Sequence, residues 1–350
     1  MEPSRSPTTG SYSVSTARRH LQTPLRLHIK NNRSGEDVFR ITESRWRAAR
    51  RRHPDTAARL RATIDWDLDR FDASMATAHA LVTWDLPTAD LARRAPKLKL
   101  VHVIGAGVEH LAPFDWLPPG VALTNNRGVH AQKAGEYVTM ALLMLNADLP
   151  RYATDQHNRR WDPAFSTPIA GKTLLVVGAG HMGRAGARAA RKLGLRVHGI
   201  RRSGRSARGF DAMGGPERLR HWLPVADFVL VTAPLTAETA GLLGADELAA
   251  MKPDAGLINM GRAAVVDYGA LCERLSSGRL RGAVLDVFDP EPLPHASPLW
   301  RTPNLLITPH VSSDDDESYI PLTLDLVLEN IGRLIAGRPL KNRVNPMLGY

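Results

Sequence analysis

Three short segments, far apart in the chain, carry side chains that together could do chemistry. They are NMGRAAVVD (259–267), LDVFDPEPLPHASPLW (285–300) and ITPH (307–310). They supply a cation in Arg262, a carboxylate in Glu291 and an imidazole in His310. A fixed cation can hold an anion, and an imidazole can donate a proton to a carbonyl oxygen. This set of groups suits the reduction of a carbonyl that lies next to a carboxylate, as in a 2-oxo acid.

The expected roles of these groups follow from their charges. A free imidazole is mostly neutral at pH 7, and a neighbouring carboxylate favours its protonated form. We therefore expect Glu291 to make His310 a competent acid for the oxygen of a carbonyl that receives a hydride. Arg262 stays charged throughout, so it can hold an anionic substrate and stabilise negative charge on that oxygen.

A glycine-rich segment upstream, LLVVGAGHMG, indicates a dinucleotide site. Gly178, Gly180 and Gly183 match the GxGxxG pattern between an apolar run and a stretch of small residues. The first glycine would allow a tight turn, the second a close approach of a pyrophosphate, and the third close packing of helix on strand. The free N–H groups at the start of that helix, near His181 and Met182, would face the phosphates.

The residues after the next apolar run, LRVHGI, indicate which dinucleotide binds. NAD sites usually place an acidic residue there, where it bonds the ribose hydroxyls. Here the run is followed by Arg201, Arg202 and Ser203, with no carboxylate. Because guanidinium groups pair well with phosphate, this turn predicts recognition of the 2′-phosphate of NADP, with NAD as the alternative cofactor.

The elements that must position these residues are parallel strands covered by helices, because short apolar runs alternate with helical patterns. A first block of expected strands comprises 25–30, 80–84, 100–105 and 121–126. A second block comprises 173–178, 195–200, 227–233, 255–260, 282–287 and 305–309. Strands of the second block are nearly continuous apolar runs, as expected for burial on both faces.

Three helical segments bear on the organisation of the chain. An arginine-rich segment, 44–61, has the pattern of one helix with a solvated face. Segment 131–149 is apolar around its circumference, so it must be covered by another domain or by a second subunit. A last helix, about 319–336, is expected to cross back to the first block. The acidic run 314–317 lies at the start of that helix, where it meets the helix dipole favourably, so we predict no metal site.

Composition narrows the classes of protein. The chain has 350 residues, 43% of them hydrophobic and 23% charged, which suits a globular protein of two domains. Cys272 is the single cysteine, so no internal disulfide can form, and no apolar run has the roughly 18 residues that a membrane span needs. Of the net charge of +11, residues 1–60 contribute 13 Lys and Arg against 5 Asp and Glu. No nucleic-acid-binding motif accompanies this charge, so neither nucleic acid nor membrane is a predicted partner.

The first 23 residues, 1–23, have their own composition. They are rich in Ser, Thr and Arg and poor in apolar residues, which predicts a disordered arm. The arm has no apolar core of a secretory signal, and we expect a cytoplasmic protein. A faint likeness to an organellar transit peptide leaves organellar targeting as the alternative.

Longer stretches make a family resemblance clear. They are VIGAGVEHL (103–111), TNNRGVHAQKAGEYVTMALL (124–143) and TAPLTAETAGLLGADELAAMKPDAGLINMGRAAVVD (232–267), beside the segments of Glu291 and His310. With these, residues 80–318 resemble the D-isomer-specific 2-hydroxyacid dehydrogenases. More narrowly, they resemble the NADPH-dependent glyoxylate/hydroxypyruvate reductase branch.

The resemblance implies an architecture. It is an α/β fold of two Rossmann-like domains with parallel sheets, with the active site in the cleft between them. The substrate domain would comprise 24–126 plus 318–350, and the dinucleotide-binding domain 127–317. The resemblance also implies a homodimer paired through the helix at 131–149.

The resemblance also implies roles for individual residues. Arg262 would hold the substrate carboxylate and carbonyl oxygen, His310 would be the acid/base, and Glu291 would bond its ring. The backbone amides of Gly105, Ala106 and Gly107 would cradle the carboxylate. Further cofactor contacts would come from Ala233, Pro234, Leu235, Asn259, Met260, Gly261, Asp286, His310 and Ser312. Among these, Asp286 would accept a hydrogen bond from the nicotinamide amide.

Two positions affect the expected substrate and its anchoring. Trp84 follows an expected strand, at a position where the substrate loop of this branch approaches the cleft. If Trp84 lines the pocket, it occupies volume and would favour small substrates. The alternative is that Trp84 is an ordinary aromatic side chain that closes the end of the strand. At Glu109 relatives commonly have Asp, and we expect the change to shift a structural contact and not the chemistry.

Three functions stay open on this sequence. The first is NADPH-dependent reduction of glyoxylate, hydroxypyruvate or a similar small 2-oxo acid. The second is reduction of a bulkier 2-oxo acid, which only the pocket residues decide. The third is a dinucleotide-sensing corepressor that binds peptide motifs, which the basic N-terminus would suit but the intact set of catalytic groups does not.

Overall fold

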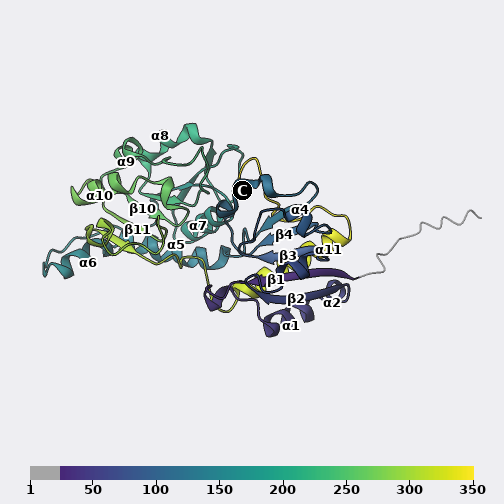
Figure 1. Ribbon diagram of the computed structural model, residues 1–350. Coiled ribbons are helices and arrows are strands. Elements are labelled where there is room, and N and C mark those ends of the chain that lie inside the picture. The colour runs from purple at the N-terminus through teal and green to yellow at the C-terminus, as the bar shows by residue number, and fades with distance from the viewer. Residues whose placement is uncertain (1–23) are drawn as a thin grey trace, which may run out of the picture.

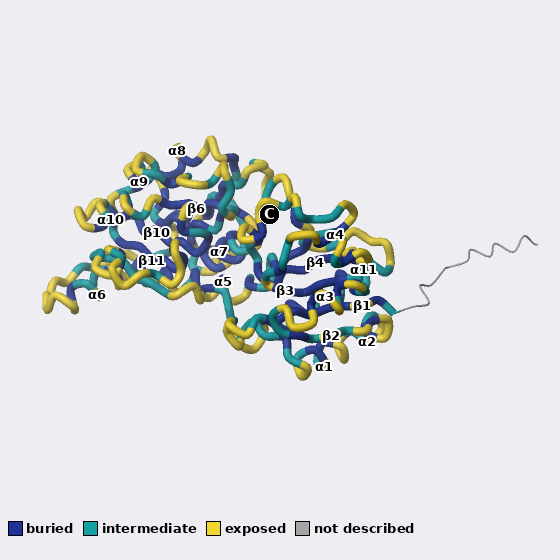
Figure 2. Tube along the Cα trace, viewed as in Figure 1, coloured by how far each residue is buried: buried dark blue, intermediate teal, exposed yellow. Residues whose placement is uncertain are grey.

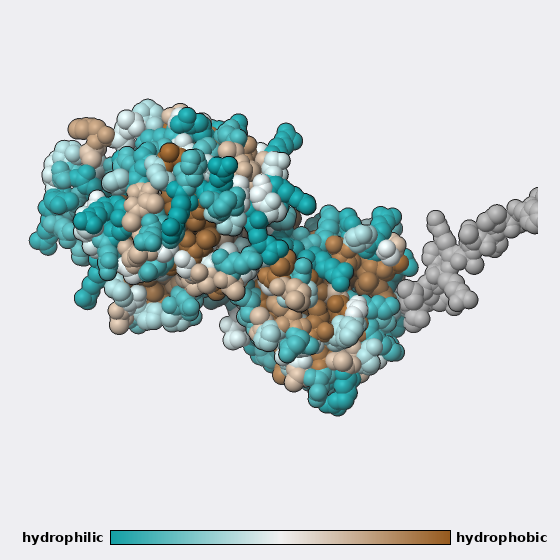
Figure 3. Space-filling model, turned by 90° about the horizontal axis from the view of Figure 1, so that it is seen from above, coloured by the Kyte–Doolittle hydropathy of each residue, from teal (hydrophilic) through white to brown (hydrophobic). Residues whose placement is uncertain are grey.

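The computed structural model describes residues 24–350, which form two lobes, each built around a parallel sheet (Figure 1). The first lobe has five strands in the order β2-β1-β3-β4-β5, and the second has seven in the order β12-β11-β10-β9-β6-β7-β8. Seen from above, the lobes meet at a narrow waist (Figure 3). The predicted α/β class with parallel sheets is confirmed.

The first sheet consists of β1 (Leu25–Asn31), β2 (Leu60–Trp66), β3 (Ala80–Thr83), β4 (Leu100–Val103) and β5 (Ala122–Asn125). Its side chains alternate between two cores: in β4, Leu100 packs with α1 (Glu43–Arg52) and α11 (Tyr319–Ile335) on one face. Val101 packs on the other face with α3 (Phe71–Met75) and α4 (Leu91–Arg94). Both residues are buried, as the two-residue period of a covered strand requires.

The second sheet consists of β6 (Thr173–Val177), β7 (Arg196–Ile200), β8 (Ala212–Gly214), β9 (Phe228–Val231), β10 (Gly256–Asn259), β11 (Gly282–Leu285) and β12 (Leu305–Ile307). One face is covered by α5 (Ala131–Asn146) and α7 (His181–Lys192). The other is covered by α8 (Leu219–Trp222), α9 (Ala245–Ala250) and α10 (Tyr268–Ser276). Figure 2 shows the strands of both lobes buried and the peripheral loops exposed.

Two predicted helices are interrupted. The expected helix at 44–61 ends at Arg52, continues as the single turn α2 (Pro54–Ala57), and gives way to β2 at Leu60. Proline has no N–H for the helical ladder and clashes with the preceding turn, which explains the break. The expected helix at 131–149 ends at Asn146, and a separate helix that was not predicted, α6 (Leu149–His157), follows Asp148, whose φ of 57° is left-handed.

The long helix α5 is covered only in part. Its buried residues, among them Tyr137, Leu142 and Leu145, pack in the core of the second lobe. Met140 and Leu143 on the same helix are 37% and 44% exposed. The second lobe therefore covers one side of the helix, and two large apolar side chains remain outside.

The chain passes twice between the lobes, after β5 and before α11. Helix α11 buries Tyr319, Leu324 and Val327 against the first sheet. Beyond it, Val344 N–H donates to the Leu123 carbonyl at 2.8 Å, so the C-terminal segment also lies on the first lobe. No helix within residues 24–350 is long and apolar enough to cross a membrane. The predicted arm at 1–23 lies outside the described residues.

Candidate active site

The three residues first singled out follow neighbouring strands of the second sheet. Arg262 comes after β10, Glu291 after β11 and His310 after β12, and these strands are adjacent and parallel. Parallel strands present their carboxyl ends at one edge, which is where open α/β sheets bind ligands. The same edge carries the glycine-rich segment after β6, so chemistry and cofactor motif share one side of the sheet.

His310 and Glu291 form a hydrogen-bonded pair. Nδ1 of His310 lies 2.8 Å from Oε2 of Glu291, and the other carboxylate oxygen accepts from the Phe288 N–H at 2.8 Å. An ionised carboxylate only accepts, so Nδ1 carries the ring proton and Nε2 is left for a substrate. The imidazole is 42% exposed, so Nε2 is accessible.

The backbone of His310 is held in an unusual conformation. Its φ of 55° lies in the left-handed region, which costs a residue with a side chain roughly 1–2 kcal/mol. The buried carboxylate of Asp286 fixes the neighbouring backbone, because it accepts from the N–H groups of Val311 at 2.9 Å and Ser312 at 3.0 Å. It also accepts from the Thr308 hydroxyl at 2.6 Å. Asp286 therefore orients the segment that carries the imidazole.

These contacts bear on the cofactor role expected of Asp286 and Ser312. The three hydrogen bonds use three of about four acceptor positions of the carboxylate. A nicotinamide amide would have to share the remaining position, and both side chains are buried. The expected contact of Asp286 with the nicotinamide thus stays a prediction.

The turn that carries Arg262 is built by Asn259. The buried amide of Asn259 donates to the Arg262 carbonyl at 3.1 Å and accepts from the Gly261 N–H at 3.0 Å. The Met260 side chain is buried in the core. The side chains of Asn259 and Met260 therefore support the turn, so any contact with a cofactor would come from their backbone.

The guanidinium of Arg262 reaches across to the first lobe. Nη1 donates to the Gly261 carbonyl at 2.8 Å, and Nε donates to the carboxylate of Glu109, which follows β4 in the first lobe. A Cβ added to Gly107 would lie only 2.0 Å from Nη2 of Arg262, so the guanidinium lies directly over this glycine. Sequence reasoning missed Glu109 as a residue of the site; its place two residues after Gly107 was the signal.

The segment 105–107 has the form of an anion cradle. Two of its carbonyls accept hydrogen bonds from the first lobe: Gly105 O from the Asn126 N–H at 2.9 Å and Ala106 O from the Asn125 amide at 2.7 Å. Among residues 24–350, the N–H groups of Gly105, Ala106 and Gly107 have no hydrogen-bond acceptor. Polar N–H groups left free beside a fixed cation are suited to a carboxylate.

Trp84 packs against this cradle. A Cβ on Gly105 would lie 2.4 Å from Cζ3 of Trp84, so only glycine fits beside the indole. The ring stacks on His110 with centroids 4.7 Å apart, and Nε2 of His110 lies 2.9 Å from the Trp84 carbonyl. The Trp84 side chain is 44% exposed, so it is not an aromatic side chain buried at the strand end but one whose ring is partly open to solvent.

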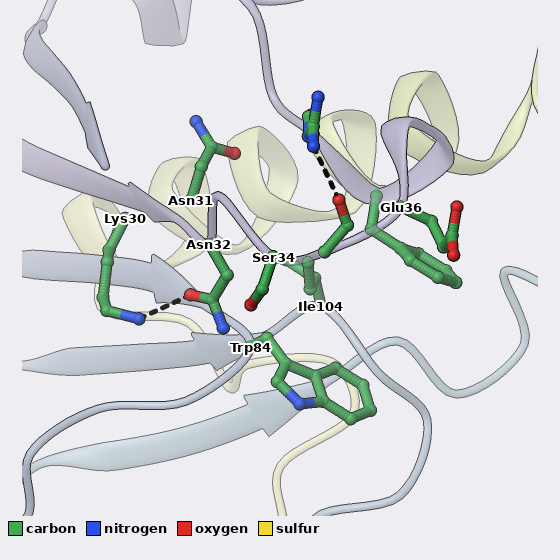
Figure 4. Close-up of a pocket in the computed structure, with 10 residues that line it drawn as sticks. Lys30, Asn31, Asn32, Ser34, Glu36, Trp84 and Ile104 are labelled. Carbon is green, nitrogen blue, oxygen red and sulfur yellow. Dashed lines mark hydrogen bonds between the residues drawn. The ribbon is translucent and has the colours of Figure 1, made fainter. Parts of the chain in front are cut away.

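On its other side Trp84 lines a cavity of about 280 Å³, shown in Figure 4. The cavity lies at the carboxyl ends of β1, β3 and β4, where the order of the first sheet reverses between β1 and β3. Its apolar walls are Phe39, Trp84 and Ile104, and its polar groups are Lys30, Asn31, Asn32, Ser34, Glu36 and Arg40.

The glycine-rich segment has the geometry that its pattern predicted. Gly178 has a φ of 103°, and a Cβ there would meet Ala233 N at 2.4 Å. A Cβ on Gly183 would meet Gly178 O at 2.3 Å, so the glycine lets α7 approach β6. Around Gly180, in contrast, no atom lies within 4 Å of an added Cβ. The middle glycine therefore faces open space, as close approach of a ligand requires.

The first turn of α7 offers free donors. Arg184 N–H is the first to bond within the helix, to Gly180 O at 3.0 Å. In the described part of the chain the N–H groups of His181, Met182 and Gly183 have no acceptor. Burial together with Arg184 and Arg127 lowers the pKa of the His181 side chain, so at neutral pH this imidazole adds no charge. Free N–H groups at a helix N-terminus are suited to a phosphate.

The turn after β7 presents the predicted basic residues. Arg202 and Ser203 are exposed, and Arg201 is partly so. Nη1 of Arg202 lies 3.7 Å from the carboxylate of Glu238, which is too long for a hydrogen bond. Within residues 24–350 no carboxylate accepts from the backbone of this turn, and the Arg201 N–H donates to Gly214 O at 3.0 Å. The guanidinium groups are thus available to an anion.

The residues after β9, which the resemblance assigns to a cofactor wall, differ in exposure. Ala233 is buried against Gly178, whereas Pro234 is exposed and Leu235 partly so. Thr232, which sequence reasoning did not single out, donates its hydroxyl to Gly178 O at 2.7 Å. This bond ties the glycine turn to the end of β9, at the point where the strand order of the second sheet reverses.

Fold and site together define a dinucleotide-dependent oxidoreductase. The family model described as "D-isomer specific 2-hydroxyacid dehydrogenase, NAD binding domain" matches residues 139–312. Glyoxylate/hydroxypyruvate reductase A of Serratia proteamaculans is 33% identical over 279 residues, which cover 78% of this chain and 87% of that one. The chain belongs to the D-isomer-specific 2-hydroxyacid dehydrogenase family.

Other relatives and solved structures carry names from the same family. Glyoxylate/hydroxypyruvate reductase B of Pectobacterium carotovorum is 31% identical over 307 residues, covering 83% of this chain and 95% of that one. A D-isomer-specific 2-hydroxyacid dehydrogenase from Xanthobacter autotrophicus, solved with NADPH and MES, has a TM-score of 0.79 at 32% identity, covering 94% and 100%. An NADPH-dependent glyoxylate/hydroxypyruvate reductase from Sinorhizobium meliloti, solved with NADP and sulfate, has a TM-score of 0.77 at 27% identity, covering 93% and 100%. The predicted family and enzyme class are confirmed.

Proposed function

We propose that this protein reduces a small 2-oxo acid, such as glyoxylate or hydroxypyruvate, to the 2-hydroxy acid with NADPH. The observation that carries the proposal is the pairing of the free N–H groups of 105–107 with the guanidinium of Arg262 directly above them. A carboxylate has matching acceptors for such a two-sided donor set. The names of the Serratia and Sinorhizobium relatives support the same substrate class.

The residues around the glycine turn fit NADPH. The open space above Gly180 and the free N–H groups at the start of α7 suit a pyrophosphate. Arg201, Arg202 and Ser203 would hold a 2′-phosphate, since no acidic residue stands there to favour ribose hydroxyls. When bound, NADPH supplies the hydride for the carbonyl carbon.

The protein's own groups then deal with the oxygen. Arg262 has five N–H donors, of which Glu109 and Gly261 accept two. The others remain for the carboxylate and the carbonyl oxygen of the substrate, where they stabilise the developing negative charge. Nε2 of His310 donates the proton that completes the hydroxyl, while Nδ1 stays bonded to Glu291.

The test is turnover by purified protein with a panel of 2-oxo acids and both reduced cofactors. We expect reduction of glyoxylate and hydroxypyruvate with NADPH in preference to NADH. Absence of turnover with every 2-oxo acid would contradict the proposal and favour a corepressor-type binding protein.

The same assay with an Arg201→Ala/Arg202→Ala variant tests the cofactor assignment. Each lost charged hydrogen bond is worth roughly 1.5–3 kcal/mol, so the KM for NADPH should rise at least about tenfold. The KM for NADH should hardly change, because NADH has no 2′-phosphate. Arg220→Ala, at an exposed arginine of α8 in the same lobe, is the matched control. Equal losses with both cofactors would contradict NADP recognition by this turn.

One observation favours the second candidate, a reductase of bulkier 2-oxo acids. The cavity of about 280 Å³ beside Trp84 is separated from the cradle by a half-exposed ring, and its walls include Phe39 and Ile104. A substituent that passes the indole would find apolar surface there. Higher kcat/KM for phenylpyruvate or 4-methyl-2-oxopentanoate than for glyoxylate in the panel would establish this candidate instead.

We also propose that the protein is a homodimer. Trp161 and Phe165, in the segment after α6, are each 96% exposed, and Met140 and Leu143 on α5 are partly exposed. Aromatic side chains so exposed mark interaction surfaces. A second copy of the chain is the occupant that the family resemblance implies for this region.

A further inference from the structure

Glu109 joins the two lobes through the substrate-binding arginine. Its carboxylate accepts from Nε of Arg262, which lies 153 positions further along the chain and in the other lobe. Both carboxylate oxygens lie close to the space above Gly107: a Cβ there would be 2.4 Å from one and 2.9 Å from the other. The ion pair therefore lies directly over the cradle and not at the periphery of the site.

Both ends of this ion pair have rigid support. Glu109 begins a short 3-10 helix (Glu109–Leu111), and both Val108 just before it and its last residue, Leu111, are buried in the core of the first lobe. On the other side, Asn259 fixes the turn of Arg262. Because both backbones are held in this way, the bond between the two side chains links the lobes at this point.

The bond also selects which guanidinium atoms face the substrate. Glu109 occupies Nε and Gly261 O occupies one donor of Nη1, so Nη2 is left over Gly107 with no acceptor in the described residues. A guanidinium is a planar fork, so fixing one edge orients the other. Glu109 thus directs the free edge of Arg262 at the N–H groups of 105–107.

We propose that Glu109 is a positioning residue for Arg262 that also clasps the two lobes in the arrangement competent for binding a 2-oxo acid. The inference rests on the proposed function and adds a residue to it. It replaces the expectation from sequence that Glu109 only shifts a structural contact. The alternative is that Glu109 competes with the substrate carboxylate for Arg262, which predicts effects of opposite sign.

The charge state of Glu109 suits this role. Burial raises the pKa of the Glu109 carboxyl, but the charge of Arg262 and its hydrogen bond outweigh burial, so the pKa lies below its ordinary value. The carboxylate is therefore ionised throughout the neutral range, and the clasp does not open with pH there.

The test compares Glu109→Gln and Glu109→Asp with the wild type, and uses Glu247→Gln as a matched control. Glu247 also pairs with an arginine, Arg220 at 2.8 Å, but lies away from the site. The measurements are kcat, the KM values for the 2-oxo acid and for NADPH, and inhibition by oxamate, the amide analogue of glyoxylate.

For Glu109→Gln we expect kcat/KM for the 2-oxo acid to fall roughly tenfold or more, the cost of a lost charged hydrogen bond. Oxamate inhibition should weaken in parallel, while the KM for NADPH should stay within about twofold. Glu109→Asp keeps the charge and should lose less than Glu109→Gln. Glu247→Gln should behave as the wild type.

Three results would overturn the proposal. A lower KM and tighter oxamate inhibition in Glu109→Gln would show that Glu109 competes with the substrate. Equal losses for both substrates, together with a lower Tm, would show a merely structural role. Unchanged kinetics would show that the ion pair does not position Arg262.

Whether the Glu109–Arg262 ion pair holds the two lobes together can also be measured without enzyme turnover. Small-angle X-ray scattering of the NADPH-loaded protein should give a larger radius of gyration for Glu109→Gln than for the wild type or Glu247→Gln. If Glu109→Gln has the larger radius of gyration but the wild type reduces no 2-oxo acid, the ion pair does hold the lobes together and the proposed function is wrong. If the wild type reduces glyoxylate but Glu109→Gln has an unchanged radius of gyration, the proposed function stands and the ion pair does not hold the lobes together.

Discussion

At the scale of single residues, the site depends on which hydrogen-bonding groups are occupied and which are free. Glu291 occupies Nδ1 of His310, and Glu109 occupies Nε of Arg262. In both pairs a carboxylate takes one edge of a cationic or ionisable side chain and leaves the opposite edge for substrate. The sequence indicated the first pair, because its segments are long and specific. It did not indicate the second, because the partners lie 153 positions apart and only the fold brings them together.

The Glu291–His310 pair can be tested by removing the charge and keeping the shape. Glu291→Gln still offers an oxygen to Nδ1, but it no longer favours the imidazolium. We expect reduction of the 2-oxo acid to persist only towards acidic pH, with NADPH binding retained. The measurement is the pH dependence of kcat/KM in the variant and the wild type. Coincident profiles would show that Glu291 does not assist proton donation by His310.

At the scale of elements, the strands that carry the site were the predictable part. Their near-continuous apolar runs reflect burial on both faces, as β9 (FVLV) and β11 (GAVL) illustrate. The strand β2 was missed, because its sequence LRATIDW mixes exposed polar with buried apolar positions at the edge of the sheet. Helix ends were missed where a single residue, Pro54 or Asp148, interrupts an otherwise helical pattern.

Two buried strand histidines give the first sheet a pH-dependent stability. Burial lowers the pKa of His28 in β1 and of His102 in β4 from 6.5 to about 4. Both are neutral in the folded protein, and the unfolded chain binds more protons below about pH 6.5. Stability therefore falls as the pH decreases from about 6.5 towards 4.

The contribution of His28 can be isolated with His28→Leu. Each pKa unit is worth about 1.4 kcal/mol, so the free energy of unfolding should fall by about 1 kcal/mol per histidine between pH 7.5 and 5.5. In His28→Leu, urea unfolding should show a loss about 1 kcal/mol smaller than that of the wild type over the same pH range. Leucine fills a similar volume, and it removes an Nε2 that is buried without a partner together with the bond of Nδ1 to the Thr63 hydroxyl at 2.9 Å; the slope of stability against pH, and not the absolute stability, is therefore the quantity compared. His221→Leu, at an exposed position, should leave the pH dependence unchanged; an equal change there would assign the effect to other groups.

At the scale of the whole molecule, two sheets place their ligand-binding edges toward a common junction. The edge of the first sheet carries the cradle at 105–107 and the cavity beside Trp84. The edge of the second sheet carries the glycine turn together with Arg262, Glu291 and His310. The resemblance implied this arrangement, whereas the contact that joins the edges, Glu109 with Arg262, emerged only from the structure.

The exposed apolar side chains around α5 and α6 predict that two copies of the chain form a dimer through this surface. Trp161 and Phe165 are almost fully exposed, and burying an aromatic side chain typically stabilises an interface by about 1.5–3 kcal/mol. The wild type should elute as a dimer in size-exclusion chromatography with light scattering. Trp161→Ser/Phe165→Ser should raise the dimer dissociation constant at least tenfold. Trp300→Ser, at an aromatic residue that is 52% exposed after β11, is the matched control and should leave the dimer intact. A monomeric wild type, or a double variant as dimeric as the wild type, would place the interface elsewhere or exclude it.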